Sequence, residues 1–204
     1  ATRRDAATTY FGTQSGAGVA LLLARQRGSI RVGIVGLGAG TLARYGQKGD
    51  HYSFYEINPL VIDLARTQFD FVSHSAAQVE IIPGDARLSL EREPPQQFDV
   101  LLVDAFSGDA IPVHLLTREA FALYFRHLKP QGVLAVHVSN RFLDLPPVVE
   151  ASARAVGARS AKVQSPEDPA NAVYRATWML VDRPTASGGN AGAVAEAPPS
   201  EEKI

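Results

Sequence analysis

The 204-residue sequence contains no cysteine. This absence excludes disulfide bonds, thiolate catalysis and cysteine-ligated zinc or iron–sulfur sites. No apolar run reaches the roughly 18 residues that are needed to cross a bilayer. Neither charge sign dominates, since 20 basic residues stand against 21 acidic ones, and this balance argues against a dedicated nucleic-acid binder. The charged first residues, 1–5, do not resemble a signal peptide.

The five histidines are scattered, and no two of them have the helical spacing of metal ligands, so we predict no metal site. Hydrophobic residues make up 46% of the chain, enough to form a core. Residues 184–204 are instead rich in alanine, glycine, proline, serine and glutamate, a composition typical of a disordered tail or linker. The sequence therefore predicts one folded domain over residues 1–183, followed by that tail.

Apolar, β-branched runs alternate with helical patterns along this domain. The expected strands are 30–35, 52–57, 79–82, 100–103, 133–138, 160–163 and 176–181. The expected helices are 18–26, 41–45, 59–68, 86–93, 117–128 and 147–156. The first, fourth and fifth strands are almost continuously apolar, as in strands buried on both faces of a parallel sheet. The alternation predicts an α/β fold: a doubly wound, mostly parallel sheet of seven strands.

Residues 36–40 read GLGAG and follow the first expected strand. Gly36, Gly38 and Gly40 would let the backbone approach a ligand closely, and the following helix would offer free N–H donors. Glu56 ends the second strand at the spacing of about 20 residues at which an acid binds ribose hydroxyls. At the end of the third strand, Asp85 with Ala86 offers an acceptor for the exocyclic amine of adenine. The alternative interpretation is that the glycines form turns and the acids cap helices.

Asp104 follows the most apolar strand and would reach the same edge of the sheet. A carboxylate there can orient an amine nucleophile, accept its proton or stabilise a cation. Ser107, Asp109 and His114 occupy the next loop and are candidate substrate contacts; Asp109 also fits as a cap of a helical segment near residue 111. His137, in the fifth strand, we interpret as a satisfied core or edge histidine.

The sequence resembles the spermidine/spermine synthase (polyamine aminopropyltransferase) family, and within it a spermidine synthase-like subgroup often fused to membrane-spanning segments. The resemblance covers residues 8–182. It is carried by the stretches TTYFGTQSGAG, RVGIVGLGAGTLARYG, YEINP, GDARLSLE, DAFSGDAIPVHLLT and VLAVHVSNRFLDLPPV. The resemblance implies a fold like that of class I S-adenosylmethionine-dependent methyltransferases, which is Rossmann-like.

The resemblance also implies roles for individual residues. The three glycines match the nucleoside-binding loop, Glu56 matches the ribose-binding acid, and Asp85 with Ala86 matches the pair beside adenine. Asp104 matches the catalytic aspartate that deprotonates the amine, and Tyr10 matches a tyrosine of the amine channel. Two positions depart from the pattern: Ala39 stands where typical members have a loop aspartate, and Ser107 stands where they have a second catalytic-loop aspartate.

The resulting hypothesis is an aminopropyltransferase that uses decarboxylated S-adenosylmethionine, without a metal, on a polyamine such as putrescine. The expected location is the cytoplasm, either as a separate protein or as the cytoplasmic domain of a membrane-fused one. The resemblance is compatible with a homodimer, and it implies no nucleic-acid partner and no membrane contact by this chain. Two alternatives stay open: a methyltransferase using intact S-adenosylmethionine, and a non-catalytic nucleoside-binding or regulatory domain of a membrane-anchored protein.

Overall fold

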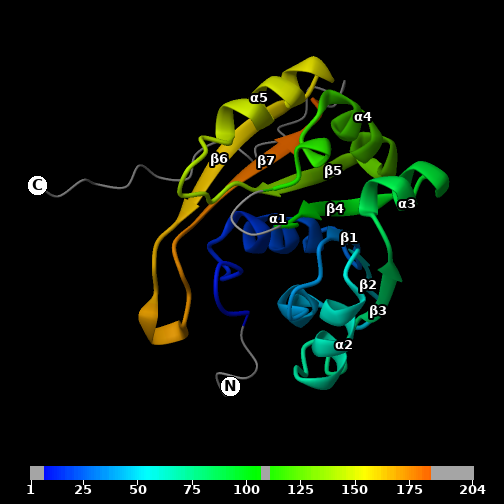
Figure 1. The fold of residues 1–204 in the computed structure, drawn as a ribbon, viewed down its shortest axis with the longest axis vertical. Helices are drawn as coiled ribbons and strands as arrows, with labels where there is room; N and C mark the ends of the chain where they lie inside the picture. Colours follow the sequence, from blue (N-terminus) through cyan, green and yellow to red (C-terminus); the bar gives the residue numbers. More distant parts are fainter. Residues whose placement is uncertain (1–6, 107–110, 185–204) are drawn as a thin grey trace, which may run out of the picture.

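A computed structural model describes residues 7–106 and 111–184, and within them a seven-stranded sheet of order β3-β2-β1-β4-β5-β7-β6 (Figure 1). Its first five strands in the sequence run parallel, and β7 is antiparallel to both β5 and β6. The strands are β1 (Arg31–Val35), β2 (His51–Glu56), β3 (Gln78–Pro83), β4 (Phe98–Val103), β5 (Leu128–His137), β6 (Arg159–Ser165) and β7 (Ala176–Asp182). The predicted fold class is confirmed, and each expected strand is present.

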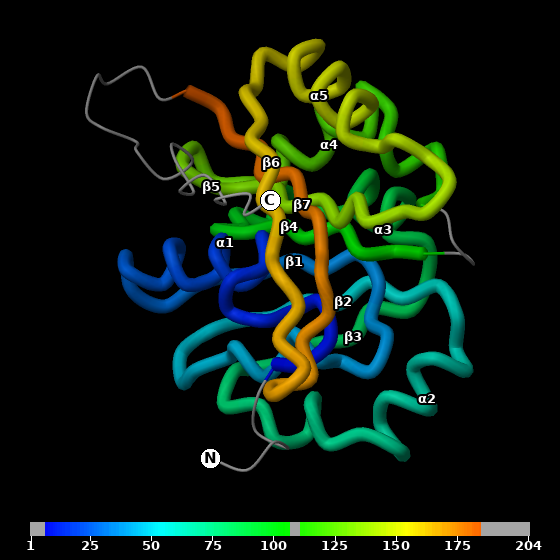
Figure 2. Tube along the Cα trace, turned by 90° about the vertical axis from the view of Figure 1, so that its left-hand side faces the viewer, coloured from blue at the N-terminus to red at the C-terminus, as the bar shows by residue number. Residues whose placement is uncertain are grey.

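Helices cover both faces of this sheet (Figure 2). Two hydrophobic clusters show the division: α1, η2 and α2 pack on one face, and α3, α4 and α5 pack on the other. The helices are α1 (Gly16–Arg25), η2 (Thr41–Tyr45), α2 (Pro59–Thr67), α3 (Ala86–Arg92), η3 (Val113–Leu115), α4 (Arg118–His127), α5 (Pro146–Ala155) and η4 (Pro169–Asn171). The core thus consists of two apolar layers separated by the sheet.

Local sequence explains where the elements begin. All six residues of β4 are buried, as expected for a central strand covered on both faces. Ser15, Asn58 and Thr117 cap α1, α2 and α4, each accepting a hydrogen bond from a backbone N–H of the first turn. The helices therefore start where the sequence places side-chain acceptors.

The last two strands form a long antiparallel hairpin that projects beyond the rest of the sheet (Figure 1). Its connecting segment holds the N-terminal segment of the described chain. The Thr9 N–H donates to the Ala172 carbonyl at 2.8 Å, and the Tyr174 N–H donates to the Thr9 carbonyl at 2.9 Å. The hairpin thereby fixes the backbone on either side of Thr9, immediately before Tyr10.

Some details differ from the sequence predictions. Strand β5 begins at Leu128 instead of residue 133, and residues 41–45 form a 3₁₀ helix. Among the described residues, no helix is long and apolar enough to span a membrane. The predicted tail, apart from Pro184, lies outside the described residues, so the disorder of 185–204 stays a prediction.

Candidate functional site

A cavity of about 500 Å³ opens at the carboxyl edge of the sheet, where β1 and β4 lie side by side. The order of strands reverses at this point, and doubly wound sheets bind their ligands in this crevice. Eight of the predicted site residues line it: Tyr10, Gly36, Gly38, Glu56, Asp85, Ala86, Asp104 and His114. Gly40 is not part of the lining, and the predicted contacts Ser107 and Asp109 lie outside the described residues.

The glycine-rich turn brings the backbone against the cavity. Gly36 has φ +98°, and a Cβ there would lie 2.5 Å from the Asp104 carbonyl oxygen, so both the conformation and the space require glycine. Gly38 has φ +53°, and a Cβ there would meet nothing within 4 Å. Gly40 also has a positive φ, but its Cβ would meet Val72. Gly36 and Gly38 therefore shape the cavity wall, whereas Gly40 serves the turn behind it.

The Glu56 carboxylate is buried and pinned by two backbone groups. Its Oε2 accepts a hydrogen bond from the Leu37 N–H at 3.0 Å, and its Oε1 accepts one from the Asn58 N–H at 2.8 Å. Glu56 thus ties the glycine turn to the end of β2. A carboxylate has about four lone-pair sites, so each oxygen can still accept a ligand hydroxyl.

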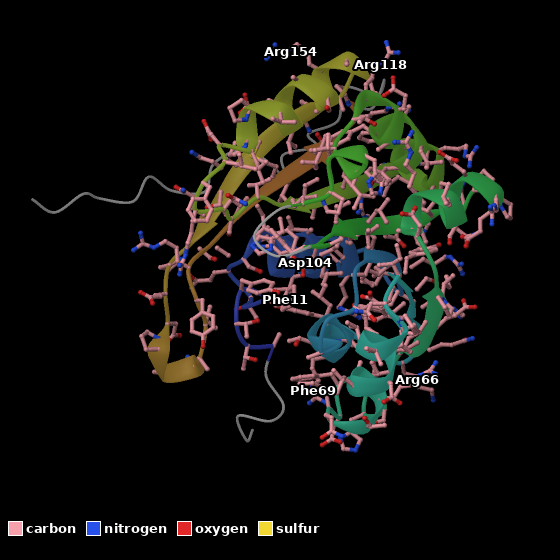
Figure 3. All side chains as sticks on the ribbon, viewed as in Figure 1. Phe11, Arg66, Phe69, Asp104, Arg118 and Arg154 are labelled. Atoms are coloured by element: carbon pink, nitrogen blue, oxygen red, sulfur yellow. The ribbon has the colours of Figure 1, made fainter. Side chains whose placement is uncertain are left out.

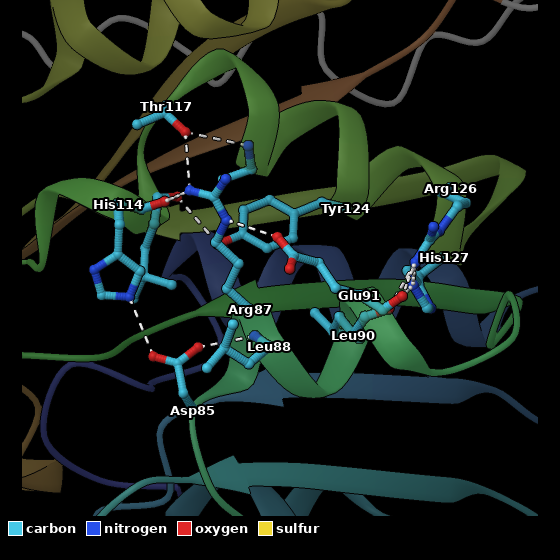
Figure 4. Close-up of polar contacts among 12 residues, drawn as sticks. Asp85, Arg87, Leu88, Leu90, Glu91, His114, Thr117, Tyr124, Arg126 and His127 are labelled. Carbon is cyan, nitrogen blue, oxygen red and sulfur yellow. Dashed lines mark hydrogen bonds and ion pairs between the residues drawn. The ribbon is translucent and has the colours of Figure 1, made fainter.

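The Asp85 carboxylate has two protein partners in the cavity wall. Its Oδ1 accepts the Leu88 N–H at 2.9 Å and caps α3, and its Oδ2 lies 3.3 Å from His114 Nε2 (Figure 4). Arg87 holds the segment that carries His114, because its Nη1 donates to the His114 carbonyl at 2.8 Å. Helix capping and a place in the cavity wall therefore coexist at Asp85.

The Asp104 side chain lies in the centre of the molecule, between the end of β4 and the N-terminal segment that carries Phe11 (Figure 3). Only 9% of the side chain is exposed, and its Oδ1 lies 2.7 Å from His137 Nδ1. Burial raises the pKa of the Asp104 carboxyl above its usual range, and the His137 contact opposes part of that rise by lowering the pKa. The result is a buried carboxylate that is more basic than an exposed one.

Aromatic rings and hydrogen-bonding groups surround the His137 ring. Its ring stacks between Tyr10 and Trp178, with both centroid distances 4.6 Å, and the Phe106 ring meets its ring edge to face at 5.0 Å. Its Nε2 lies 2.9 Å from the Ser139 hydroxyl, which accepts the Thr177 N–H at 2.8 Å.

When His137 is neutral, one placement of protons satisfies all of these hydrogen bonds. An ionised Asp104 accepts only, so Nδ1 of His137 carries the proton and donates it, and the Ser139 hydroxyl donates to Nε2. The chain of hydrogen bonds thus runs from Thr177 in β7 through Ser139 and His137 to Asp104. It fixes the direction of the Asp104 carboxylate at the cavity wall.

The pairing of His137 with Asp104 was not predicted from the sequence. The burial expected of His137 is correct, but its partner is the carboxylate that the sequence singles out for chemistry. Strand register contains the missing signal: Val103 of β4 pairs with Val136 of β5, so the next residues along the two strands are neighbours. A one-dimensional pattern does not reveal this register.

Tyr10 lies against the same group. Burial raises the pKa of Tyr10 well above the usual tyrosine value, and the nearby Asp104 raises it further, so the phenol stays protonated. Its neighbour Phe11 is fixed by its carbonyl oxygen, which accepts a hydrogen bond from the Tyr45 hydroxyl at 2.6 Å. Thr9 has φ +59°, a rare conformation for a β-branched residue. The strained backbone thus directly precedes a side chain of the site.

No group of three or more histidine, aspartate or glutamate side chains within residues 7–106 and 111–184 could hold a metal ion. The acids of the cavity, Glu56, Asp85 and Asp104, have backbone or histidine partners instead. Their arrangement suits the recognition of a polar organic ligand.

Comparison with known proteins finds sequence relatives that match about half of this chain. No family model matches the sequence. The polyamine aminopropyltransferase of Vibrio vulnificus is 36% identical over 118 residues, which cover 55% of this chain and 38% of that protein. A probable polyamine aminopropyl transferase of Bifidobacterium longum is 32% identical over 111 residues, covering 52% of this chain and 23% of that protein. The matched part thus spans well under half the length of these relatives.

Solved structures with the same fold extend over more of the chain. Spermidine synthase from Thermotoga maritima superposes with a TM-score of 0.58 at 20% identity, covering 81% of this chain and 57% of that one. Human methyltransferase-like protein 13, solved in complex with SAH, superposes with a TM-score of 0.63 at 21% identity, covering 86% and 83% of the two chains. At this identity the superpositions show the fold, which both proteins share with this chain.

Proposed function

We propose that this chain transfers an aminopropyl group from decarboxylated S-adenosylmethionine to the primary amine of a small acceptor. One observation carries the proposal: the acids at three strand ends, Glu56, Asp85 and Asp104, line a single cavity together with the glycine turn. The similarity to proteins named polyamine aminopropyltransferase supports it and makes putrescine the reference acceptor.

The residues of the cavity suit the nucleoside of such a donor. The volume of about 500 Å³ lies in the range of about 300–1,000 Å³ that is usual for small-molecule sites. Glu56 retains lone pairs for ribose hydroxyls, and Asp85, beside Ala86 in the cavity wall, offers a carboxylate acceptor to an adenine amine. The absence of a side chain at Gly38 leaves open space along the wall.

When bound, the donor supplies a carbon activated by a positively charged sulfur. The contribution of the chain is to position the acceptor and manage its proton. A free amine with a pKa of about 10.4 is mostly protonated at neutral pH and cannot attack in that form. The Asp104 carboxylate can bind the ammonium group and accept its proton, which frees the nitrogen lone pair for attack, and the raised pKa of Asp104 makes this acceptance more favourable.

The other groups around Asp104 would keep it in position. His137 holds one carboxylate oxygen at 2.7 Å, and Tyr10 covers the site as a neutral phenol. Because Asp104 is largely removed from water, its charge would act on a developing cation more strongly than an exposed carboxylate would. The site thus combines a fixed base with a partly desolvated cavity.

A methyltransferase that uses intact S-adenosylmethionine is the second candidate. One observation favours it: Ala39 lines the cavity without a charge, so the described glycine turn offers no acid for the ammonium of an aminopropyl group. Proteins of the same fold have been solved in complex with SAH, as in methyltransferase-like protein 13. The two functions differ in the donor and in the nucleoside that is released.

Calorimetry with three ligands tests the proposal: decarboxylated S-adenosylmethionine, intact S-adenosylmethionine and methylthioadenosine. We expect the decarboxylated donor and methylthioadenosine to bind, and incubation with putrescine or another primary amine to release methylthioadenosine. Preference for the intact donor, with release of S-adenosylhomocysteine, would favour the methyltransferase. Failure of all three ligands to bind would contradict both enzymatic functions. Binding without turnover would favour the non-catalytic nucleoside-binding domain.

A further inference from the structure

The tip of the β6–β7 hairpin, residues 168–174, has a defined structure of its own. The Asp168 N–H donates to the Val173 carbonyl, and the Val173 N–H donates to the Asp168 carbonyl, both at 2.9 Å. The Asp168 carboxylate also accepts a hydrogen bond from the Asn171 side chain at 2.6 Å. None of the roles considered so far uses this tip, and none of its residues lines the cavity of the candidate site. The tip nevertheless presents a fixed edge, residues 172–174, to the N-terminal segment (Figure 2).

Side-chain packing adds to the two hydrogen bonds that join Thr9 to this edge. A Cβ on the buried Gly12 would lie 3.0 Å from Val173 Cγ1, so Val173 fills the space beside that glycine. Two residues at the contact have positive φ angles that are rare for residues with a side chain, +59° at Thr9 and +55° at Ala172. Such conformations persist only where the surrounding structure fixes them. The segment and the tip therefore hold each other in one arrangement.

The glycines of residues 8–18 fit this arrangement. That stretch, TTYFGTQSGAG, carries part of the family resemblance, but its glycines lie outside the nucleoside-binding turn. A Cβ on Gly16 would lie 2.3 Å from the Trp178 Cβ of β7, and a Cβ on Gly18 would lie 2.5 Å from the Gly12 carbonyl oxygen. The absence of side chains at these positions therefore lets the segment lie close against the hairpin.

The docked segment carries Tyr10 to the candidate base. The Tyr10 ring stacks on that of His137 with a centroid distance of 4.6 Å, and His137 contacts Asp104. Tyr10 and Phe106 line the cavity of the candidate site, and they also line a second cavity of about 870 Å³ between the end of β5 and the hairpin strands. Their rings therefore form a wall between Asp104 and the second cavity. This wall helps to keep the Asp104 side chain, of which 9% is exposed, away from water.

We infer that the hairpin tip is a positioning element for the proposed reaction: through Thr9 and Gly12 it holds Tyr10 over Asp104 and keeps water from the carboxylate that accepts the amine's proton. The inference rests on the proposed function, because it concerns the base of that reaction. No residue of 168–174 lines either cavity, so the tip acts only through the N-terminal segment. Val173 is its positioning side chain.

A shortened hairpin tests the inference in the otherwise full chain. Replacing residues 167–174 with Asn-Gly supplies a two-residue turn and leaves the pairing of Ser165 with Ala176 in place. Methylthioadenosine should still bind by calorimetry, because Glu56 and Asp85 are held at their own strand ends. The rate of transfer to putrescine should fall by about 10–100-fold, since small displacements at a reacting group have effects of this size.

The pH profile of the shortened chain distinguishes positioning from a loss of stability. The titratable groups that interact with Asp104 are His137 of β5 and Tyr10 of the N-terminal segment. Burial is the main cause of the raised pKa of Asp104, so water that enters where Tyr10 stood should lower this pKa. The acid limb of kcat/KM should therefore move to lower pH. A merely less stable chain would not move this limb.

Point variants of Val173 make the same test without changing the length of the chain. Val173→Ala removes the packing on Gly12 and should shift the acid limb in the same direction by a smaller amount. Val173→Thr keeps the branched shape and should restore the wild-type profile. Val148→Ala is the matched control, because Val148 is an exposed valine of α5 that lines neither cavity.

The fluorescence of Trp178 gives a readout that needs no activity. It is the one tryptophan of the chain, it is fully buried, and its ring lies 6.3 Å from that of Phe11 in the N-terminal segment. Acrylamide should quench this fluorescence more strongly in the shortened chain and in Val173→Ala than in the wild type. Quenching in Val148→Ala should equal that of the wild type.

The outcomes separate this inference from the proposed function. An acid limb at the wild-type position in the shortened chain, or in Val173→Ala if the shortened chain does not fold, would overturn the inference and leave transfer by the wild type intact. Failure of the wild-type chain to bind the nucleoside or to transfer the aminopropyl group would instead overturn the proposed function, and the inference with it. A shift to lower pH in the tip variants, but not in Val173→Thr or the control, supports the inference.

Discussion

Two cavities lie at the carboxyl edge of the sheet, and they differ in how their charged groups are held. The first contains Glu56, Asp85 and Asp104, and the second is lined by Arg141, Lys162 and Arg175. In the first cavity, Glu56 and Asp85 accept backbone hydrogen bonds, and Asp104 is paired with His137. In the second cavity, the cations are exposed side chains on long, flexible stems. Fixed acids give a preorganised site that can discriminate by geometry, whereas unpaired surface cations attract by charge alone. Under the proposed function, donor recognition and chemistry belong to the first cavity.

Replacing Asp104 with asparagine should have the largest effect. The substitution keeps the shape of the side chain but removes the carboxylate that we propose as the base, and general bases contribute about 10²–10⁴-fold to rate. We expect the rate of transfer to fall by a factor in that range while methylthioadenosine affinity stays unchanged. Steady-state kinetics and calorimetry on the same preparation measure the two quantities.

Asp63→Asn is the matched control for this experiment, because Asp63 is exposed on α2 and lines neither cavity. It should retain the wild-type rate. If Asp104→Asn also retained that rate, Asp104 would have no role as base, and the chemical part of the comparison would fail.

Replacing Glu56 with glutamine should mainly affect the donor. Both Glu56 oxygens accept backbone N–H groups, and an amide offers only one oxygen, so one of the two N–H groups loses its acceptor. The cost of an unsatisfied buried donor is about 1–3 kcal/mol. That cost falls on the free protein as well as on the complex. Methylthioadenosine should bind about 10–100-fold more weakly by calorimetry because its ribose hydroxyls lose a charged acceptor, and a hydrogen bond to a charged group contributes about 1.5–3 kcal/mol. An unchanged affinity would show that the geometry of the first cavity does not depend on Glu56.

Replacing His137 with asparagine tests the contact between His137 and Asp104. The histidine lowers the pKa of Asp104 against the effect of burial, so its loss should raise that pKa further. Asp104 acts as a base only when ionised, and activity is lost as the pH falls through its pKa. The acid limb of the profile of kcat/KM against pH should therefore move to higher pH, with a fall in rate of about tenfold near neutral pH. An acid limb at the wild-type position would mean that another group sets it.

The pH dependence of stability gives the smallest expected effect. Burial is the main cause of the raised pKa of Asp104, so the native state holds this proton more tightly than the unfolded chain does. The contribution to stability is present below the ordinary aspartate pKa of about 3.9 and is lost as the pH rises through the raised native value. Asparagine does not titrate.

Between about pH 4 and pH 7, the thermal midpoint of the wild type should therefore fall relative to that of Asp104→Asn. A shift of about 2–4 °C is expected for each kcal/mol in a chain of this size. Differential scanning calorimetry at the two pH values measures it. A midpoint difference that is independent of pH would contradict the direction assigned to the pKa of Asp104.

Much of the fold was predictable because its central strands are buried on both faces. The apolar runs of β1 and β4 can be recognised as strands from their own residues, without knowledge of the neighbouring strands. Strand β5 was predicted too short, since Pro130, Gln131 and Gly132 break the apolar pattern within it. The antiparallel insertion of β7 between β5 and β6 was not predicted, because no local pattern specifies which strand a hairpin joins.

The candidate site likewise has one part that the sequence predicted and another part that it did not. Gly36, Glu56 and Asp104 follow strand ends, and strand ends of a parallel sheet meet at one edge, so sequence order alone brings them together. The partnership of His137 with Asp104 depends on strand register and on aromatic rings from two other segments. The second cavity depends on the β6–β7 hairpin, which brings Lys162 and Arg175 beside the end of β5. Such long-range packing is not encoded in any single motif.

A crystal structure of the chain with methylthioadenosine and a primary amine bound together is the most direct test. It should show the nucleoside in the first cavity, with its ribose at Glu56, and the amine nitrogen within about 2.6–3.2 Å of the Asp104 carboxylate, the distance that proton transfer requires. A nucleoside bound elsewhere, or an amine held away from Asp104, would contradict the claim that the first cavity binds the donor and places the amine at Asp104.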